Sequence, residues 1–138
     1  MNAIADGIFV GTVSDAEDEP LLRGRGIEVV ISLTHDAPNT GSVDRVDIPM
    51  LDGPRNEYSS FADAAETVVE RREAGKRVLV HCSAGASRSP AVAAAAMTRL
   101  TDRNLDEAFE QVLARRPEVD PHEALVRRAA TFVARGRE

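Results

Sequence analysis

The segment from Arg77 to Met97 constrains the fold more than any other, because a short loop of small residues joins an apolar run to an alanine-rich run. Its apolar part, residues 78–80, is typical of a buried strand. Its alanine-rich part starts at Pro90, and proline is well tolerated in the first turn of a helix. We therefore predict a strand, a tight loop and a helix in immediate succession.

The loop has the composition of an oxyanion site. Gly85 supplies a permissive backbone, and its neighbours have side chains too small to fill the concavity. A strand, loop and helix of this kind point several backbone N–H groups and the positive end of the helix dipole at one spot. We predict that this spot binds phosphate through Ser83, Ala84, Gly85, Ala86, Ser87 and Arg88.

Cys82, the only cysteine, precedes this loop and would lie at its floor. Helix N-termini and nearby cations favour the thiolate form, which is the nucleophile. Arg88 would close the ring, because its planar fork can bind two phosphate oxygens. Taken alone, a cysteine after an apolar run is most often a small core residue. The joint pattern of His81, Cys82, five small residues, Arg88 and Ser89 favours the catalytic interpretation instead.

This string resembles the signature of the cysteine-dependent protein phosphatases, and its ending Arg88-Ser89 looks most like their dual-specificity branch. Weaker similarities extend over nearly the whole chain. They comprise residues 8–11 with Asp15-Ala16, the stretch from Leu21 to Leu33, and Arg116-Pro117. The resemblance implies a single dual-specificity phosphatase-like catalytic domain over residues 1–138.

The resemblance also implies roles for individual residues. Cys82 attacks phosphorus and forms a phosphocysteine, while Arg88 binds the equatorial oxygens. Ser89 assists release of the thiolate in the second step, and its alternative role is that of a helix N-cap. His81 supports the loop through hydrogen bonds rather than acting as a general base.

A proton donor is needed because an alkoxide or phenoxide is a poor leaving group. Asp52 follows a strand-like run, and in the resembling family an aspartate lies about thirty residues before the cysteine. Asp52-Gly53-Pro54 is also strong turn chemistry, so the alternative is a turn residue. Asp44 and Asp47 are rival acids, although Asp47 alternates with apolar residues as on a solvated strand face.

Apolar runs and helical periodicity predict an α/β fold with a central, largely parallel sheet of four to five strands and helices on both faces. Ligands bind such sheets at the carboxyl ends of their strands. The expected strands are residues 8–10, 28–33, 45–49 and 77–81. The expected helices are one through residues 61–69, one that opens with a capping box of Asn104 and Glu107, and one that starts within residues 120–123.

Composition narrows the function classes. The net charge of −6 argues against nonspecific binding to nucleic acid. No run is long enough for a membrane span, and no basic and apolar leader opens the chain. A single cysteine excludes an internal disulfide and fits a reducing compartment, so we expect a cytoplasmic protein. The sequence leaves the oligomeric state open, with a monomer as the favoured state. No spaced ligand set surrounds His35 or His122, so neither a metal nor a cofactor is expected.

Three functions remain. The first is a protein phosphatase for phosphotyrosine, with phosphoserine and phosphothreonine as further substrates if the pocket is shallow. The second is a phosphatase for an inositol phosphate, a lipid headgroup or an RNA 5′ end. The third is a noncatalytic phosphate-binding module. The neutral side chains of the loop favour a singly phosphorylated ester over a more highly charged substrate.

Overall fold

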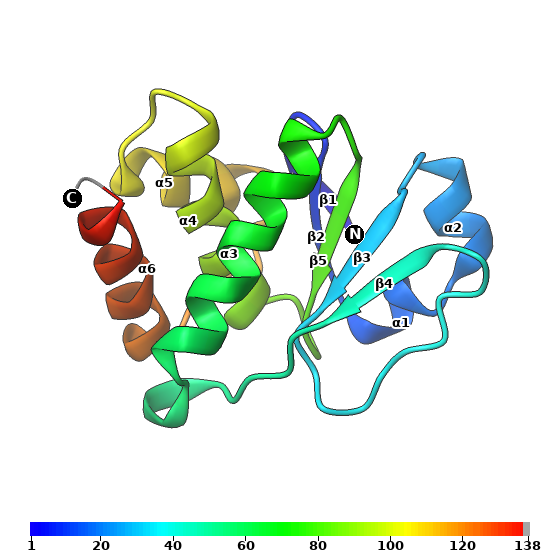
Figure 1. Ribbon diagram of the computed structural model, residues 1–138, viewed down its shortest axis with the longest axis horizontal. Coiled ribbons are helices and arrows are strands. Elements are labelled where there is room, and N and C mark those ends of the chain that lie inside the picture. Colours follow the sequence, from blue (N-terminus) through cyan, green and yellow to red (C-terminus); the bar gives the residue numbers. More distant parts are fainter. Residues whose placement is uncertain (137–138) are drawn as a thin grey trace.

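Five short strands form one sheet in the order β1-β2-β5-β3-β4, and helices cover both of its faces (Figure 1). This arrangement is seen in a computed structural model that describes residues 1–136. Along the chain the elements are β1 (Asn2–Ala5), β2 (Ile8–Gly11), α1 (Val13–Ala16), α2 (Glu19–Gly24), β3 (Val29–Ser32), β4 (Asp44–Asp47), the 3-10 turn η1 (Gly53–Arg55), α3 (Tyr58–Glu73), β5 (Val78–His81), α4 (Arg88–Leu100), α5 (Leu105–Arg115) and α6 (Glu123–Arg135).

The central strand β5 pairs in parallel with β2 on one side and with β3 on the other. Side chains alternate between the two faces of a strand, so each buried strand feeds two cores. Val78 and Val80 belong to the larger core, which α3, α4, α5 and α6 also line. Leu79 belongs to the smaller core under α1 and α2. Because β5 is buried on both faces, its apolar run is continuous rather than alternating.

The predicted fold class is confirmed, with five strands, of which four are parallel. The prediction missed β1, which pairs antiparallel with β2. Its four residues carry a single fully buried side chain, that of Ile4, so its hydrophobic pattern is too weak to recognise. Strand β4 ends at Asp47, two residues before the predicted end at Pro49. The last helix, α6, begins at Glu123 and is capped by the His122 side chain rather than by Asp120.

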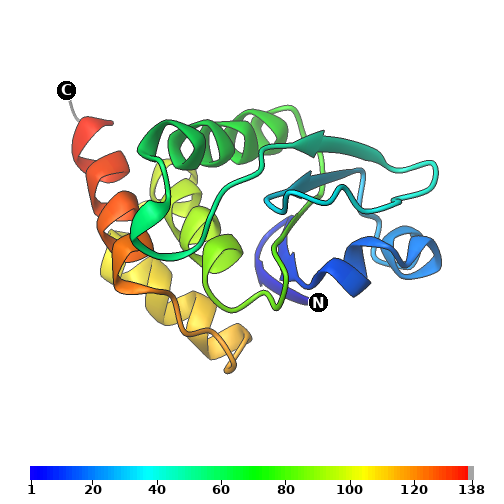
Figure 2. The ribbon, with the colours of Figure 1, turned by 90° about the horizontal axis from the view of Figure 1, so that it is seen from below.

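All four parallel strands end at the same edge of the sheet, and Figure 2 views the molecule from that end. The loop after β5, helix α1 and the segment that leads from β4 into η1 lie there together (Figures 1 and 2). The sheet thereby brings segments that are far apart in sequence to one edge. Within residues 1–136, no helix combines the length and the apolar character that crossing a membrane requires.

Candidate active site

The loop from Cys82 to Ser87 leaves the carboxyl end of β5 and enters α4, as the sequence predicts. Helix α4 begins at Arg88 with Ser87 as its N-cap residue, and the Ser87 side chain does not bond to the helix backbone. The alternative role of Ser89 as the N-cap is therefore wrong, because Ser89 lies within the first turn and is fully buried. The N-terminus of a 13-residue helix thus opens directly above the loop.

Four consecutive carbonyl groups of the loop accept hydrogen bonds from donors outside it. The carbonyl of Ser83 accepts from the Val13 amide at 3.2 Å, and that of Ala86 accepts from the Asp120 amide at 2.8 Å. The carbonyls of Ala84 and Gly85 accept from the Arg116 guanidinium at 3.0 and 2.9 Å. In a planar trans peptide the N–H points opposite to the carbonyl. The amides of residues 84–87 are therefore turned toward the inside of the loop.

Gly85 is required at its position for two reasons. Its φ of +66° lies in the left-handed region that side chains disfavour. A Cβ atom there would also lie 2.7 Å from the Gly11 carbonyl oxygen and 2.7 Å from Nη2 of Arg116. The loop packs so closely against β2 and Arg116 that only glycine fits.

Cys82 lies at the floor of this loop and is 3% exposed. Its Sγ atom is 3.2 Å from the Oγ atom of Ser89, which projects from the first turn of α4. Ser89, which the sequence predicts to assist release of the Cys82 thiolate, is thus in direct contact with the Cys82 sulfur. A hydroxyl at this position can donate a hydrogen bond to a sulfur anion.

Arg88 spans the mouth of the loop. Nη2 donates to Ser83 Oγ at 3.0 Å, and Nη1 donates to the Met50 carbonyl at 3.1 Å. Within residues 1–136 its side chain forms no ion pair with a carboxylate. A guanidinium has five N–H donors, so these two bonds leave donors for phosphate oxygens. Arg88 therefore connects the loop to the segment that follows β4.

His81 is fully buried at the end of β5, between Ser32 and the backbone of Cys82. Its Nδ1 atom lies 3.2 Å from the Cys82 carbonyl oxygen, and its Nε2 atom lies 2.8 Å from Ser32 Oγ. Burial lowers the pKa of His81 below its ordinary value of about 6.5; the hydrogen bond to Cys82 opposes this shift, and the positive charge of Arg88 adds to it. The ring is therefore neutral at pH 7. Because a carbonyl only accepts, Nδ1 carries the proton and Nε2 accepts from Ser32.

Asp52 lies at the edge of the loop, where its Oδ1 atom accepts a hydrogen bond from Ser87 Oγ at 2.7 Å. It is exposed, and it occupies the N-cap position of η1 without capping that turn. The rivals Asp44 and Asp47 lie on the edge strand β4, and Asp47 pairs with Arg45 at 2.9 Å. Of the three candidate acids, Asp52 is the one for which the structure shows a hydrogen bond to the loop.

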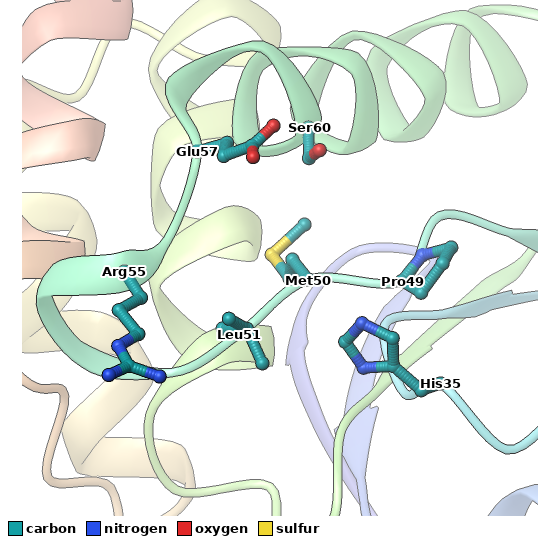
Figure 3. Close-up of a pocket in the computed structure, with 7 residues that line it drawn as sticks. All are labelled: His35, Pro49, Met50, Leu51, Arg55, Glu57 and Ser60. Atoms are coloured by element: carbon teal, nitrogen blue, oxygen red, sulfur yellow. The ribbon is translucent and has the colours of Figure 1, made fainter.

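Two cavities lie in this region, and His35 lines both of them. One of about 280 Å³ opens at the mouth of the loop and is lined by Val13, Thr34, His35, Asp36, Ser83 and Arg88. The other, of about 160 Å³, lies between the segment after β4 and the start of α3 (Figure 3). Its lining residues are His35, Pro49, Met50, Leu51, Arg55, Glu57 and Ser60.

Sequence reasoning missed the function of Arg116, whose only sequence signal was its place in the motif Arg116-Pro117. The guanidinium is 4% exposed, and its Nη1 atom also donates to Asn2 Oδ1 at 2.7 Å. Within the described part of the chain it pairs with no carboxylate. A buried charge must be compensated by hydrogen bonds. Here the loop carbonyls compensate it, and the positive charge is held against the outer side of the loop.

Comparison with known proteins agrees with this geometry. Residues 8–132 match the model of the family described as "Dual specificity phosphatase, catalytic domain". The chain is 32% identical over 130 residues to the dual specificity protein phosphatase Mpk3 of Drosophila melanogaster, covering 91% of this chain and 32% of the relative. It is 34% identical over 125 residues to dual specificity protein phosphatase 14 of Mus musculus, covering 86% of this chain and 62% of that protein.

A similar fold is found among solved structures. The crystal structure of human DUSP28 superposes with a TM-score of 0.89 at 22% identity, covering 99% of this chain and 98% of that one. At this identity the similarity concerns the fold. The chain spans about a third of Mpk3 and less than two thirds of phosphatase 14. The similarity to these relatives therefore concerns their catalytic domain and not their full length.

The depressed pKa of His81 predicts how stability depends on pH. The unfolded state takes up a proton near pH 6.5 and the folded state resists it, so this residue contributes stability above that pH. The contribution is lost as the pH falls from about 6.5 toward the lower folded-state value. Urea midpoints between pH 8 and 5 should decline more steeply for the wild-type protein than for His81→Gln. Parallel declines would contradict the neutral, buried imidazole.

Replacing Arg116 should damage the loop itself. Arg116→Met removes the donors to Ala84, Gly85 and Asn2, and the unfolding free energy should fall by about 3 kcal/mol because buried acceptors lose their partners. Arg116→Lys should restore little, since one ammonium lacks the planar fork. Arg115→Met is the matched control, because its exposed side chain forms no ion pair within residues 1–136. Equal urea midpoints for the two methionine variants would refute the support of the loop by Arg116.

Proposed function

This chain belongs to the dual specificity phosphatase catalytic-domain family, and from that premise we propose that residues 1–138 form one catalytic domain that hydrolyses phosphomonoesters of proteins through a phosphocysteine. The family implies phosphoprotein substrates. The proposed reaction acts on phosphotyrosine and on phosphoserine or phosphothreonine, and the residues of the site have the roles given below.

The observation that carries this proposal is the outward anchoring of the loop carbonyls at Ser83, Ala84, Gly85 and Ala86. Their partner amides face the concave side, above Cys82, where the helix α4 dipole adds positive potential. A preorganised set of donors stabilises the negative charge that develops in a phosphoryl transfer without having to reorganise. Fold similarity alone would not support an activity, but this arrangement of donors does.

In the proposed first step, the inward-facing amides of residues 84–87 and the Arg88 guanidinium bind the phosphate oxygens, within the predicted loop from Ser83 to Arg88. The Cys82 thiolate attacks phosphorus from below, and the bond between phosphorus and the ester oxygen breaks. Asp52 donates its proton to the departing oxygen. The products are a phosphocysteine and the free alcohol or phenol, with Asp52 left as a carboxylate.

In the proposed second step, Asp52 takes a proton from a water molecule, which attacks phosphorus and displaces the sulfur. The Ser89 hydroxyl, 3.2 Å from Sγ, donates a hydrogen bond to the departing thiolate. His81 remains neutral and holds the Cys82 carbonyl, so that it supports the loop without taking up a proton. Inorganic phosphate is released and Asp52 is again protonated. No proposed step uses a metal ion.

The side chains around the loop favour a singly phosphorylated protein over a polyanionic substrate. Ser83, Ala84, Ala86 and Ser87 add no positive charge to the loop. The 280 Å³ cavity at its mouth is lined by one positively charged side chain, Arg88, and by the negatively charged carboxylate of Asp36. An inositol polyphosphate or an RNA 5′ end carries further anionic groups, which Asp36 would repel.

A substrate panel tests the proposal. The wild-type protein should hydrolyse phosphotyrosine and phosphothreonine peptides with a higher kcat/KM than inositol phosphates or RNA 5′ ends. Cys82→Ser should abolish turnover and still bind the phosphopeptides, because the amides and Arg88 remain in place. Activity in Cys82→Ser would exclude the phosphocysteine route. A preference for inositol phosphates or RNA would assign the same chemistry to a non-protein substrate.

Asp52 has a separate test that depends on the leaving group. Asp52→Asn should lower kcat/KM for phenyl phosphate by about 10²-fold, because phenoxide needs a proton. The same variant should lower kcat/KM for 2,4-dinitrophenyl phosphate by less than about tenfold, since that phenoxide leaves unprotonated. Asp47→Asn is the control and should leave both rates near wild type. Equal losses on the two esters would remove Asp52 from the acid role.

A further inference from the structure

The segment that carries Asp52 has little structure of its own. The turn η1 that follows comprises three residues, and the Asp52 side chain does not cap it. Gly53, with a φ of +76°, comes next in the chain, and Leu51 on the other side is 46% exposed. The position of the carboxylate must therefore be set by contacts from other parts of the molecule.

Arg128, on helix α6, binds the backbone of this segment. Its Nε and Nη2 atoms donate to the Asn56 carbonyl oxygen at 3.1 and 2.9 Å. Nη2 also lies 3.4 Å from the Pro54 carbonyl oxygen. The side chain is half-buried, and within residues 1–136 it forms no ion pair with a carboxylate. The guanidinium is thus committed to the backbone of this segment, 72 residues earlier in the sequence.

Asn56 connects the Arg128 contact to the residues on either side of Asp52. It is 2% exposed, its amide N–H donates to the Gly53 carbonyl at 3.1 Å, and its Nδ2 atom donates to the Leu51 carbonyl at 2.9 Å. Its own Oδ1 atom is buried, and none of the residues that the structure describes forms a hydrogen bond with it. The carbonyl that Arg128 binds therefore belongs to the residue whose side chain holds the carbonyl directly before Asp52.

We propose that Arg128 is a positioning residue for Asp52, acting through Asn56 and the turn η1. The inference rests on the proposed function, in which Asp52 donates a proton to the leaving oxygen. A proton donor must come within hydrogen-bond reach of that oxygen, and a misplacement of about 1 Å can cost about 10²-fold in rate. The Ser87 hydroxyl donates to Asp52 Oδ1, and the Arg128 guanidinium donates to the Asn56 carbonyl four residues later in the same segment.

The test compares two esters that differ in their need for a proton. Arg128→Met keeps the apolar stem and removes the donors. It should lower kcat/KM for phenyl phosphate about tenfold and that for 2,4-dinitrophenyl phosphate by no more than about twofold. Arg127→Met is the matched control on the same helix, because Arg127 pairs with the exposed Glu123 and does not touch the segment. The control should leave the ratio of the two rates unchanged.

A general loss of structure would affect both esters alike, so the ratio separates positioning from folding. If Arg128→Met does not fold, Arg128→Lys gives the same comparison, since it keeps the charge but cannot bind both carbonyls with a planar fork. In the Asp52→Asn background, the Arg128 substitution should cause little further loss on phenyl phosphate. An unchanged ratio in the variant that folds, or full additivity with Asp52→Asn, would overturn the inference.

The outcome for Arg128 is distinguishable from a failure of the proposed function. If Asp52→Asn itself shows no preference between the esters, then Asp52 is not the acid and the proposal for Arg128 is wrong with it. If Asp52→Asn discriminates strongly and Arg128→Met does not, the proposed function stands and Arg128 has only a structural role.

Discussion

The direction of the loop carbonyls is the constraint on which the rest of the site depends. A peptide that turns its oxygen outward turns the next N–H inward, and in this loop four successive carbonyls are held outward. The donors come from the start of α1, from the residue after α5 and from the segment before α6. The orientation of the amides above Cys82 therefore depends on two distant parts of the chain, at Val13 and at residues 116–120, and not on the loop alone.

The proposed phosphate-binding loop and the segment of the proposed acid, Asp52, are held by neighbouring residues of the chain. Arg116 and the Asp120 amide hold the phosphate loop, and the His122 amide donates to Ser87 Oγ at 2.8 Å. The same Ser87 hydroxyl donates to Asp52, and Arg128 holds the segment behind it. Residues 116–128, from the end of α5 into α6, thus contact both the phosphate-binding loop of the proposal and the segment of its proposed acid, Asp52. Relative placement within a fraction of an ångström is what proton transfer to a bound ester requires.

The sequence-based predictions succeeded where a pattern of neighbouring residues follows from their local backbone or burial alone. The continuous apolar run of β5 and the glycine that permits a left-handed backbone at position 85 are of this kind. The capping box of Asn104 and Glu107 is confirmed for the same reason, since both bonds form within one turn. The predictions missed β1, whose pairing with β2 has little hydrophobic signal. At Ser89 only the alternative role as a helix N-cap is wrong, because Ser87 takes that position. Ser89 contacts the Cys82 sulfur at 3.2 Å, and its role in catalysis stays a prediction.

The sequence by itself determined the succession of strand, small-residue loop and helix, and with it the placement of Cys82, Arg88 and Ser89 around one loop. Those residues lie within eight positions of one another, so their geometry follows from local backbone preferences. Only the tertiary structure decided that Ser32 faces His81, that Arg116 turns the loop carbonyls outward and that Arg128 holds the Asp52 segment. These contacts join residues separated by 30 to more than 70 positions. Their partners are backbone carbonyls or a hydroxyl, groups that carry no distinctive sequence signal.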